Sequence, residues 1–377
     1  MFIELHLLQN FAPSNLNRDD TGSPKECEFG GYRRARISSQ CFKRAIRMHF
    51  PALLRKEELA TRSKLVVTQK VVPALVGRGR DSEQARIAVE RALGAVKLKL
   101  DDGKTQYLLF LSASEVAALT DACDRNFDVL LRAAGGNPGN KKSKNEARAE
   151  IPSEVRSAVE SILDGGKAAD LALFGRMLAD LPEKNIDAAA QVAHAISTNR
   201  VSPELDYFTA VDDLNPKEET GAGMIGTVEF NSACFYRYSN VDLAQLAGNL
   251  KGDIELARRT LDAFIRSTIE AVPSGKQNSM AAHNPPSFVM AVVREAGLWS
   301  LANAFLDPVR PDEDGDLVRK SIRRLAQHWG ALTKMYGTKG IVYHGFAALE
   351  DGEIEHLGQP VGNFDALVEA VMSKAKF

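Results

Sequence analysis

Residues 38–50 read SSQCFKRAIRMHF, and their polar and apolar side chains separate onto two faces of a predicted helix. Ser38 is a suitable N-cap, and Pro51 ends the helix after Phe50. Four polar side chains share one face, because they follow the spacing i, i+3, i+4 and i+7: Gln40, Lys43, Arg44 and Arg47. The opposite stripe is expected to pack on a sheet: Phe42, Ala45, Ile46, His49 and Phe50.

The charge around this helix has one sign. Residues 30–50 hold six basic side chains and no acid: Arg33, Arg34, Arg36, Lys43, Arg44 and Arg47. The helix N-terminus adds Ser38, Ser39 and unpaired backbone N–H groups, which favour anions. The segment therefore predicts a phosphate-binding surface that does not distinguish bases. The alternative is the solvated basic face that many amphipathic helices carry.

The net charge of the chain is only −1, so this basic surface must be offset elsewhere. Residues 204–219 hold six acids against Lys217 alone: Glu204, Asp206, Asp212, Asp213, Glu218 and Glu219. A separated pattern of this kind can form one basic groove on a protein that is neutral overall.

The bulk composition indicates a globular, cytoplasmic protein. Of the 377 residues, 44% are hydrophobic and 26% charged, and no apolar run reaches the roughly 18 residues that span a membrane. The N-terminus lacks the basic region of a signal peptide. The four cysteines form no CxxC pair, which favours reduced cytosolic thiols. The seven histidines show no metal-binding spacing, so neither a metal nor a cofactor is expected.

The order of predicted elements indicates an α+β fold. Residues 2–8 alternate apolar and polar side chains, as in a half-buried strand, and residues 13–31 are predicted to form a loop. Helical patterns dominate residues 56–196, including a capping box at Ser112 and Glu115. A strand at 227–238, a helix at 253–271 and a strand at 288–293 follow. This order suits a ferredoxin-like (RRM-type) palm that carries a large helical insertion.

Several segments resemble the backbone subunit of the type I-E CRISPR Cascade complex, a member of the RAMP superfamily. They are SNLNRDD (14–20), FGG (29–31), RRARISSQ (33–40), KRA (43–45), ALFGRM (172–177), QVAHAIST (191–198), DYFTAVDDL (206–214) and FYRY (235–238), with a loop at Lys276-Gln277 that ends in Asn284-Pro285. The segments follow the family's order over residues 1–310, and nothing is carried over to residues 311–377.

The resemblance implies three structural parts. A palm would comprise residues 1–55 and 227–377, the latter with C-terminal helices, and residues 56–196 would form helical fingers. Residues 197–226 would form a protruding thumb loop or hairpin that folds over RNA.

The resemblance also implies a non-catalytic protein present in several copies, which form a helical filament along one CRISPR guide RNA. Its partners would be other Cascade subunits, a recruited nuclease-helicase, and target DNA that is reached through the guide. No membrane partner is expected. Four positions resemble phosphate contacts of the family: Ser38, Gln40, Lys43 and Arg47. The surrounding segments are expected to add further RNA contacts: Arg18, Lys25, Arg34, Arg36, Ser39, Arg44, Lys276 and Gln277.

The acidic stretch maps onto the family's thumb. Its carboxylates repel phosphate, so contact with nucleic acid is expected through apolar side chains that wedge between bases. Met177 and Phe208 are the candidates for contacting a displaced base, and Val201 and Leu214 are further apolar candidates. The alternative is that these side chains belong to the core.

Two features of the sequence have more than one interpretation. Lys141, Lys142 and Lys144 in the fingers are hypothesised to contact the DNA duplex, or else form a basic loop without a partner. Gly221, Gly223 and Gly226 spell GxGxxG, but no strand precedes them and no helix follows, so a dinucleotide site is rejected.

Two other functions remain open from the sequence. One is an endoribonuclease of the RAMP superfamily that acts on guide precursor or target RNA, for which Asp19 and Asp20 would be the catalytic candidates. The other is a general single-strand binder, which would need exposed aromatic side chains for base stacking. Aromatic residues make up only 7% of the chain, which disfavours the second function.

Overall fold

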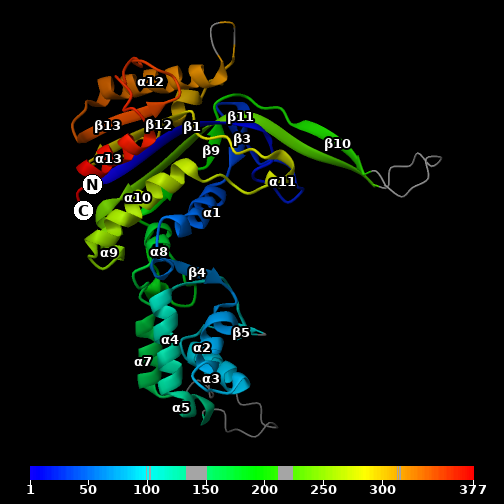
Figure 1. Cartoon of the computed structure of the whole chain (residues 1–377), viewed down its shortest axis with the longest axis vertical. Helices are drawn as coiled ribbons and strands as arrows, with labels where there is room; N and C mark the ends of the chain where they lie inside the picture. Colours follow the sequence, from blue (N-terminus) through cyan, green and yellow to red (C-terminus); the bar gives the residue numbers. More distant parts are fainter. Residues whose placement is uncertain (99, 102, 133–150, 211–223, 312, 314–315) are drawn as a thin grey trace, which may run out of the picture. The chain divides into compact units, whose positions relative to one another are not determined.

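The computed structural model describes residues 1–98, 100–101, 103–132, 151–210, 224–311, 313 and 316–377 (Figure 1). The chain divides into two compact units. Unit 1 comprises Met1–Phe50, Ala190–Leu243 and Leu261–Phe377, and unit 2 comprises Pro51–Ala189 and Ala244–Thr260. No helix among the described residues is both long and apolar enough to cross a membrane.

Unit 1 is built on an antiparallel sheet in the order β13-β12-β1-β11-β9-β3-β2, with β8 and β10 also paired to β11. The strands are β1 (Phe2–Ser14), β2 (Glu26–Phe29), β3 (Tyr32–Ile37), β8 (Ala190–Val192), β9 (Ala195–Ser197), β10 (Glu204–Ala210), β11 (Met224–Asp242), β12 (Phe288–Arg294) and β13 (Ile341–Ala348). The long strand β11 is central, because four other strands pair with it.

Helices cover both faces of this sheet. On one face, α12 (Leu317–Tyr336) packs through Leu325 and Trp329 against Tyr236 of β11. On the other face, α1 (Ser39–His49) packs through Phe42 against Phe235, the neighbouring residue of β11. Because successive side chains of a strand point to opposite faces, α1 and α12 lie on opposite sides of the sheet, as Figure 1 shows. The remaining helices of unit 1 are α11 (Gln277–Met280), α13 (Phe364–Lys374) and the second half of α10 (Ile254–Glu270).

Unit 2 is mainly helical and has its own core. Its helices are α2 (Val72–Val76), α3 (Ser82–Ala95), α4 (Ala113–Arg125), α5 (Phe127–Arg132), α7 (Ser153–Ile162) and α8 (Ala169–Phe174), with most of α9 (Leu243–Asn249). Two small strand pairs join β4 (Ala60–Ser63) to β7 (Leu109–Ser112) and β5 (Leu100–Asp101) to β6 (Lys104–Thr105). The predicted capping box is confirmed, because Ser112 Oγ accepts from Glu115 N and Glu115 Oε2 accepts from Ser112 N.

Strand β1 differs from the prediction of a half-buried strand. Glu4 and His6, expected on a solvent face, are both fully buried, because β1 lies between β11 and β12 and is covered on both faces. The Glu4 carboxylate pairs with Arg294 and accepts hydrogen bonds from Tyr238 Oη (2.9 Å) and the backbone N–H of Trp299 (2.6 Å). Two hydrogen bonds to Oε1 and the ion pair with Arg294 make this buried carboxylate a structural group of the sheet.

Most of the other helices and strands that the sequence predicts are present in the structure. The α+β class is confirmed, as are a helix capped by Ser38, a helix near 253–271 and a strand near 288–293. The predicted loop at 13–31 is wrong in part, because it contains β2, which forms a hairpin with β3. The hairpin turns at Gly30, where φ is +62° and an added Cβ would lie 2.0 Å from Leu306 O. The assignment of palm, fingers and thumb stays a prediction.

Candidate nucleic-acid interface

The N-terminus of α1 is fixed by two hydrogen bonds that involve Ser38. Its hydroxyl accepts from the backbone N–H of Cys41 (3.3 Å), and its own N–H donates to Asn17 Oδ1 (2.8 Å). Ser38 is therefore buried and acts as the helix cap, whereas Ser39 is half-buried. The cap aligns the start of α1 with the loop at 15–25 that follows β1.

The predicted cationic face of α1 is present on the surface of unit 1. Gln40 and Arg44 are exposed, while Lys43 and Arg47 are half-buried. Burial lowers the pKa of the Lys43 ammonium from its ordinary value. Three cations and one amide thus project from a helix that Phe42 and Ile46 anchor in the core.

The loop at 15–25 brings further cations to the start of α1. Asn15 Nδ2 donates to Gly22 O within the loop and to Glu229 O of β11, at 2.9 Å each, so one side chain closes the loop and ties its start to the sheet. Lys25 lies half-buried where the loop meets β3, since its carbonyl accepts from the backbone N–H of Arg36 (2.8 Å). Arg18 lies exposed on the same loop.

Arg36 is held by a neutral histidine. Its guanidinium lies 2.9 Å from His194 Nδ1 and also donates to Glu26 O (3.2 Å). Burial, followed by the charges of Arg36 and Lys25, lowers the pKa of His194, so the imidazole is neutral at pH 7 and can accept from the guanidinium. The structure therefore places Arg36 and Lys25 together beside α1.

A second loop, at 273–282, packs against the first. An added Cβ at Gly275 would lie 2.3 Å from Leu16 O, so only glycine allows the two backbones to approach this closely. Lys276 follows with a left-handed φ of 52° and is half-buried. The amide of Gln277 donates to Pro273 O (3.0 Å) and Ala282 O (3.2 Å), so it holds the loop together.

Arg34, which the sequence predicts to contact RNA, is placed in the interior of unit 1. Its side chain is fully buried, and the guanidinium donates to four backbone carbonyls: Ser197 O (2.9 Å), Thr198 O (3.0 Å), Phe305 O (2.6 Å) and Leu306 O (3.1 Å). Arg34 is thus a structural residue that joins β3 to two other segments, and it is not available to RNA. Its neighbour Arg33 is exposed but pairs with Glu26.

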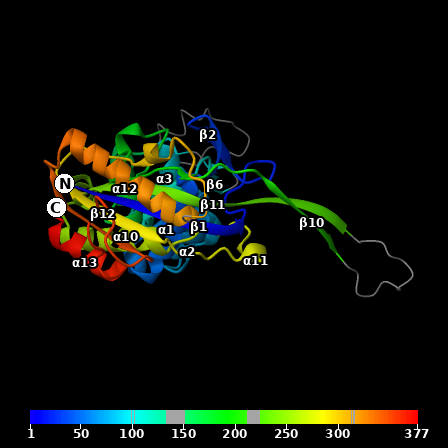
Figure 2. The same cartoon turned by 90° about the horizontal axis from the view of Figure 1, so that it is seen from above.

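The part of the acidic stretch that the structure describes, residues 204–210, forms strand β10, which pairs with β11 and extends away from the rest of the sheet (Figure 2). Strand β10 pairs with β11 from Glu204–Phe230 to Ala210–Met224, and Leu205 and Tyr207 are 67% and 64% exposed. Phe208, 39% exposed, lies over Gly226, where an added Cβ would lie 2.4 Å from the ring. Gly226, the last glycine of the GxGxxG pattern, therefore leaves space for this ring. The sequence pattern alone did not indicate this packing.

Two candidate wedge residues differ in burial, and several candidates fall outside the described residues. Val201 is 5% exposed and packs in the core with Phe42, so its predicted role in displacing bases is wrong. Met177 of unit 2 is 78% exposed, while the preceding Arg176 is buried against Glu115 (2.7 Å). The candidates outside the described residues are Lys141, Lys142, Lys144 and Leu214.

The chain is similar to known proteins over nearly its whole length. The model of the CT1975-like protein family matches residues 3–370. The chain belongs to the CT1975-like family. Two solved structures match over 100% of this chain and 100% of their own. The first is described as "CRISPR RNA-guided surveillance complex, pre-nicking" and matches at 30% sequence identity with a TM-score of 0.87. The second is described as "CRISPR RNA-guided surveillance complex" and matches at 26% sequence identity with a TM-score of 0.76. No curated protein sequence matches. The resemblance to a Cascade backbone subunit is confirmed.

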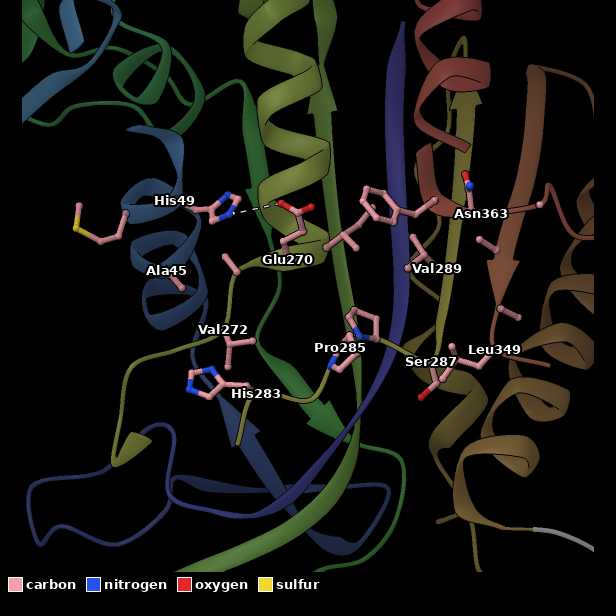
Figure 3. A pocket seen from close by; sticks show the side chains of 18 residues that line it. Ala45, His49, Glu270, Val272, His283, Pro285, Ser287, Val289, Leu349 and Asn363 are labelled. Carbon is pink, nitrogen blue, oxygen red and sulfur yellow. Dashed lines mark ion pairs between the residues drawn. The ribbon is translucent and has the colours of Figure 1, made fainter. Parts of the chain in front are cut away.

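A hollow of about 700 Å³ lies beside α1 in this CT1975-like chain (Figure 3). His49 projects into it, with Nδ1 3.0 Å from Ser267 Oγ and Nε2 3.5 Å from Glu270 Oε2. The three side chains are those of a hydrolytic triad. Ser267, however, is fully buried on α10, so no substrate reaches its hydroxyl. The arrangement is therefore a helix–helix contact, and the mainly apolar lining includes Val289 and Leu349.

Asp19, the candidate of the endoribonuclease interpretation, shapes its own loop in the CT1975-like chain. Its Oδ1 accepts from Thr21 Oγ1 (2.7 Å), Thr21 N (2.9 Å) and Ser23 N (3.0 Å). The hydrogen bond from Thr21 is the main cause that lowers the pKa of this carboxyl, which makes it a weaker base. Within the described residues, no group of three or more His, Cys, Asp and Glu side chains could hold a metal ion.

Proposed function

We propose that this chain is a non-catalytic backbone subunit of a CRISPR RNA-guided surveillance complex. Several copies lie side by side along one guide RNA in the cytoplasm, and together with other Cascade subunits and a recruited nuclease-helicase they act in antiviral defence. The observation that carries the proposal is the cationic face of α1, flanked by two loops that contribute Arg18, Lys25 and Lys276. The similarity to two subunits of such complexes supports it.

The grip on the guide is through phosphates. Lys43, Arg44 and Arg47 provide positive charge along one helix face, and Lys25 and Arg36 extend it at the helix N-terminus. None of these groups reads base identity in this geometry, so sequence recognition is left to pairing between guide and target DNA. In this proposal unit 1 contains a ferredoxin-like palm, and unit 2 contains the fingers.

The β10–β11 hairpin acts as the thumb. Its exposed apolar side chains are Leu205, Tyr207 and Phe208, and its exposed acids are Glu204 and Asp206. Carboxylates repel phosphate, so the hairpin contacts nucleic acid through the apolar side chains and displaces a base from the stack. One displaced base per copy interrupts the guide–target duplex at regular intervals and relieves its helical winding.

A non-catalytic role fits the chemistry of the loop at 15–25. A loop nuclease needs a carboxylate that can take a proton or hold a metal, whereas Asp19 already accepts three hydrogen bonds within its own turn. A cleavage assay tests this directly. The purified complex and an Asp19→Ala variant are incubated with guide precursor and target RNA in Mg²⁺, and a product made only by the unmodified protein would contradict the proposal.

Copurification from the host tests guide binding. We expect RNA of one discrete length to accompany the chain, and we expect the Arg44→Glu, Arg47→Glu double variant to lose it. The matched control is Lys334→Glu, Lys339→Glu, which reverses two exposed cations of unit 1 away from α1. If thermal melting shows that both variants are folded and the two recover equal amounts of RNA, the role of α1 is refuted.

A further inference from the structure

A second hollow, with a basic lining, lies along α12 on the face of the sheet opposite α1. It has a volume of about 520 Å³ and is formed between α12 and the segment at 307–310. Four cations, one amide and one carboxylate line it: Arg310, Lys320, Arg323, Arg324, Gln327 and Asp307. The charge of the lining is therefore strongly positive.

The walls of this hollow are held in place by buried contacts. The backbone N–H of Val309 donates to Thr198 O (2.9 Å), and Ser321 Oγ lies 2.8 Å from Thr198 Oγ1. Ile322 and Leu325 on the inner side of α12 are buried in the core. The basic side chains consequently start from a rigid backbone, which favours a preformed site.

The arginines of this hollow differ in their partners from Arg266 and Arg319, two other surface arginines of unit 1. Arg266 pairs with Asp262 at 3.0 Å, and Arg319 pairs with Glu350 at 2.8 Å. In the hollow, Arg324 lies 3.9 Å from Asp307, at the limit of an ion pair.

Arg310 and Arg323 are both exposed, and neither forms an ion pair with any residue that the structure describes. Guanidinium groups gathered without strong carboxylate partners form a site for an external anion.

We propose that Arg310, Arg323 and Arg324 bind the phosphodiester backbone of single-stranded DNA. Arginine forks match phosphate oxygens, and the lining has no aromatic side chain for base stacking, so the contact is independent of base sequence. The choice of DNA rests on the proposed function. With the guide on the α1 face and the target strand paired to it, the strand left with free phosphates is the displaced DNA strand.

The test uses the complex purified with its guide and a labelled oligothymidylate, which cannot pair with a mixed-sequence guide. In an Arg310→Gln, Arg323→Gln, Arg324→Gln variant, we expect weaker binding and a slope of log affinity against log salt that is smaller by about 2, since each single-strand phosphate contact contributes about 0.7. The corresponding triple lysine variant keeps the charge and is expected to keep the slope. Guide content is measured in every sample.

The outcomes separate the two proposals. If only the α1 variants lose the guide, the proposed function is supported and the α12 site is unaffected. If the glutamine variant loses oligothymidylate binding but keeps the guide, the α12 site is supported. Unchanged oligothymidylate binding in the glutamine variant overturns it. The proposal is also overturned if the three arginines are needed for binding of a polyglutamate peptide and not for binding of DNA, because the surface would then bind an acidic protein. Arg319→Gln, on the same helix but paired with Glu350, is the matched control.

Discussion

Replacement of Arg34 by methionine separates a structural arginine from an RNA-binding one. The guanidinium is buried and donates to four carbonyls. Thr198 O keeps another donor, the N–H of Val309 at 2.9 Å, so three carbonyls lose the donor that Arg34 provides. Each buried acceptor left without a partner costs about 1–3 kcal/mol, which puts the loss of unfolding free energy at about 3 kcal/mol or more.

Thermal melting measures this loss. A change of 1 kcal/mol shifts the melting temperature of a unit of this size by about 2–4 °C, so the Arg34→Met variant is expected to melt about 6–12 °C lower. Arg33→Met is the matched control, because Arg33 is 60% exposed and makes a surface ion pair worth at most about 1 kcal/mol. Its melting temperature is expected to fall by no more than about 4 °C.

The RNA measurement completes the test. At a temperature where both variants are folded, Arg34→Met is expected to bind guide RNA as the unmodified chain does. If Arg34→Met melted like the unmodified chain and instead lost RNA, the burial argument would be wrong and the side chain would have to face the nucleic acid.

Three further outcomes are expected. Replacing Lys43, Arg44 and Arg47 by alanine should reduce the slope of log RNA affinity against log salt by about 2 per copy, and an unchanged slope would exclude phosphate contacts on α1. Burial and the charge of Arg294 lower the pKa of His6 from 6.5 to about 3. The unfolded chain therefore takes up a proton that the folded chain does not, so stability is complete above pH 6.5 and falls by about 1.4 kcal/mol per unit below it. From pH 7 to pH 5 this loss is about 2 kcal/mol, and a His6→Gln variant should lack it in melts at both pH values. Phe208→Ala should leave the melting temperature and guide content unchanged but abolish regularly spaced unpaired bases in chemical probing of the guide–target duplex; persistence of that spacing would refute a wedge role.

Local patterns explain why α1 could be predicted. The cap at Ser38, the apolar side chains Phe42 and Ile46 and the stop at Pro51 all lie within a few helical turns, and helix formation depends on such near neighbours. The capping box of α4 was predictable for the same reason.

Long-range contacts explain what the sequence could not show. Arg34 and Arg36 look equivalent in the sequence, yet one is buried under carbonyls more than 160 residues away and the other lies beside His194. Val201 reads like an exposed apolar residue of an acidic loop, but the fold places it against Phe42. The burial of a side chain depends on which distant segments pack over it, and no local pattern records that.

The sequence by itself determined the family, the α+β class and the basic helix with its cap, because motif order and helical spacing are properties of neighbouring residues. Only the tertiary structure decided which cations reach the surface and which become structural. It also revealed the basic hollow on α12, since that site is formed by residues of two segments that meet only when the sheet and its covering helix are assembled.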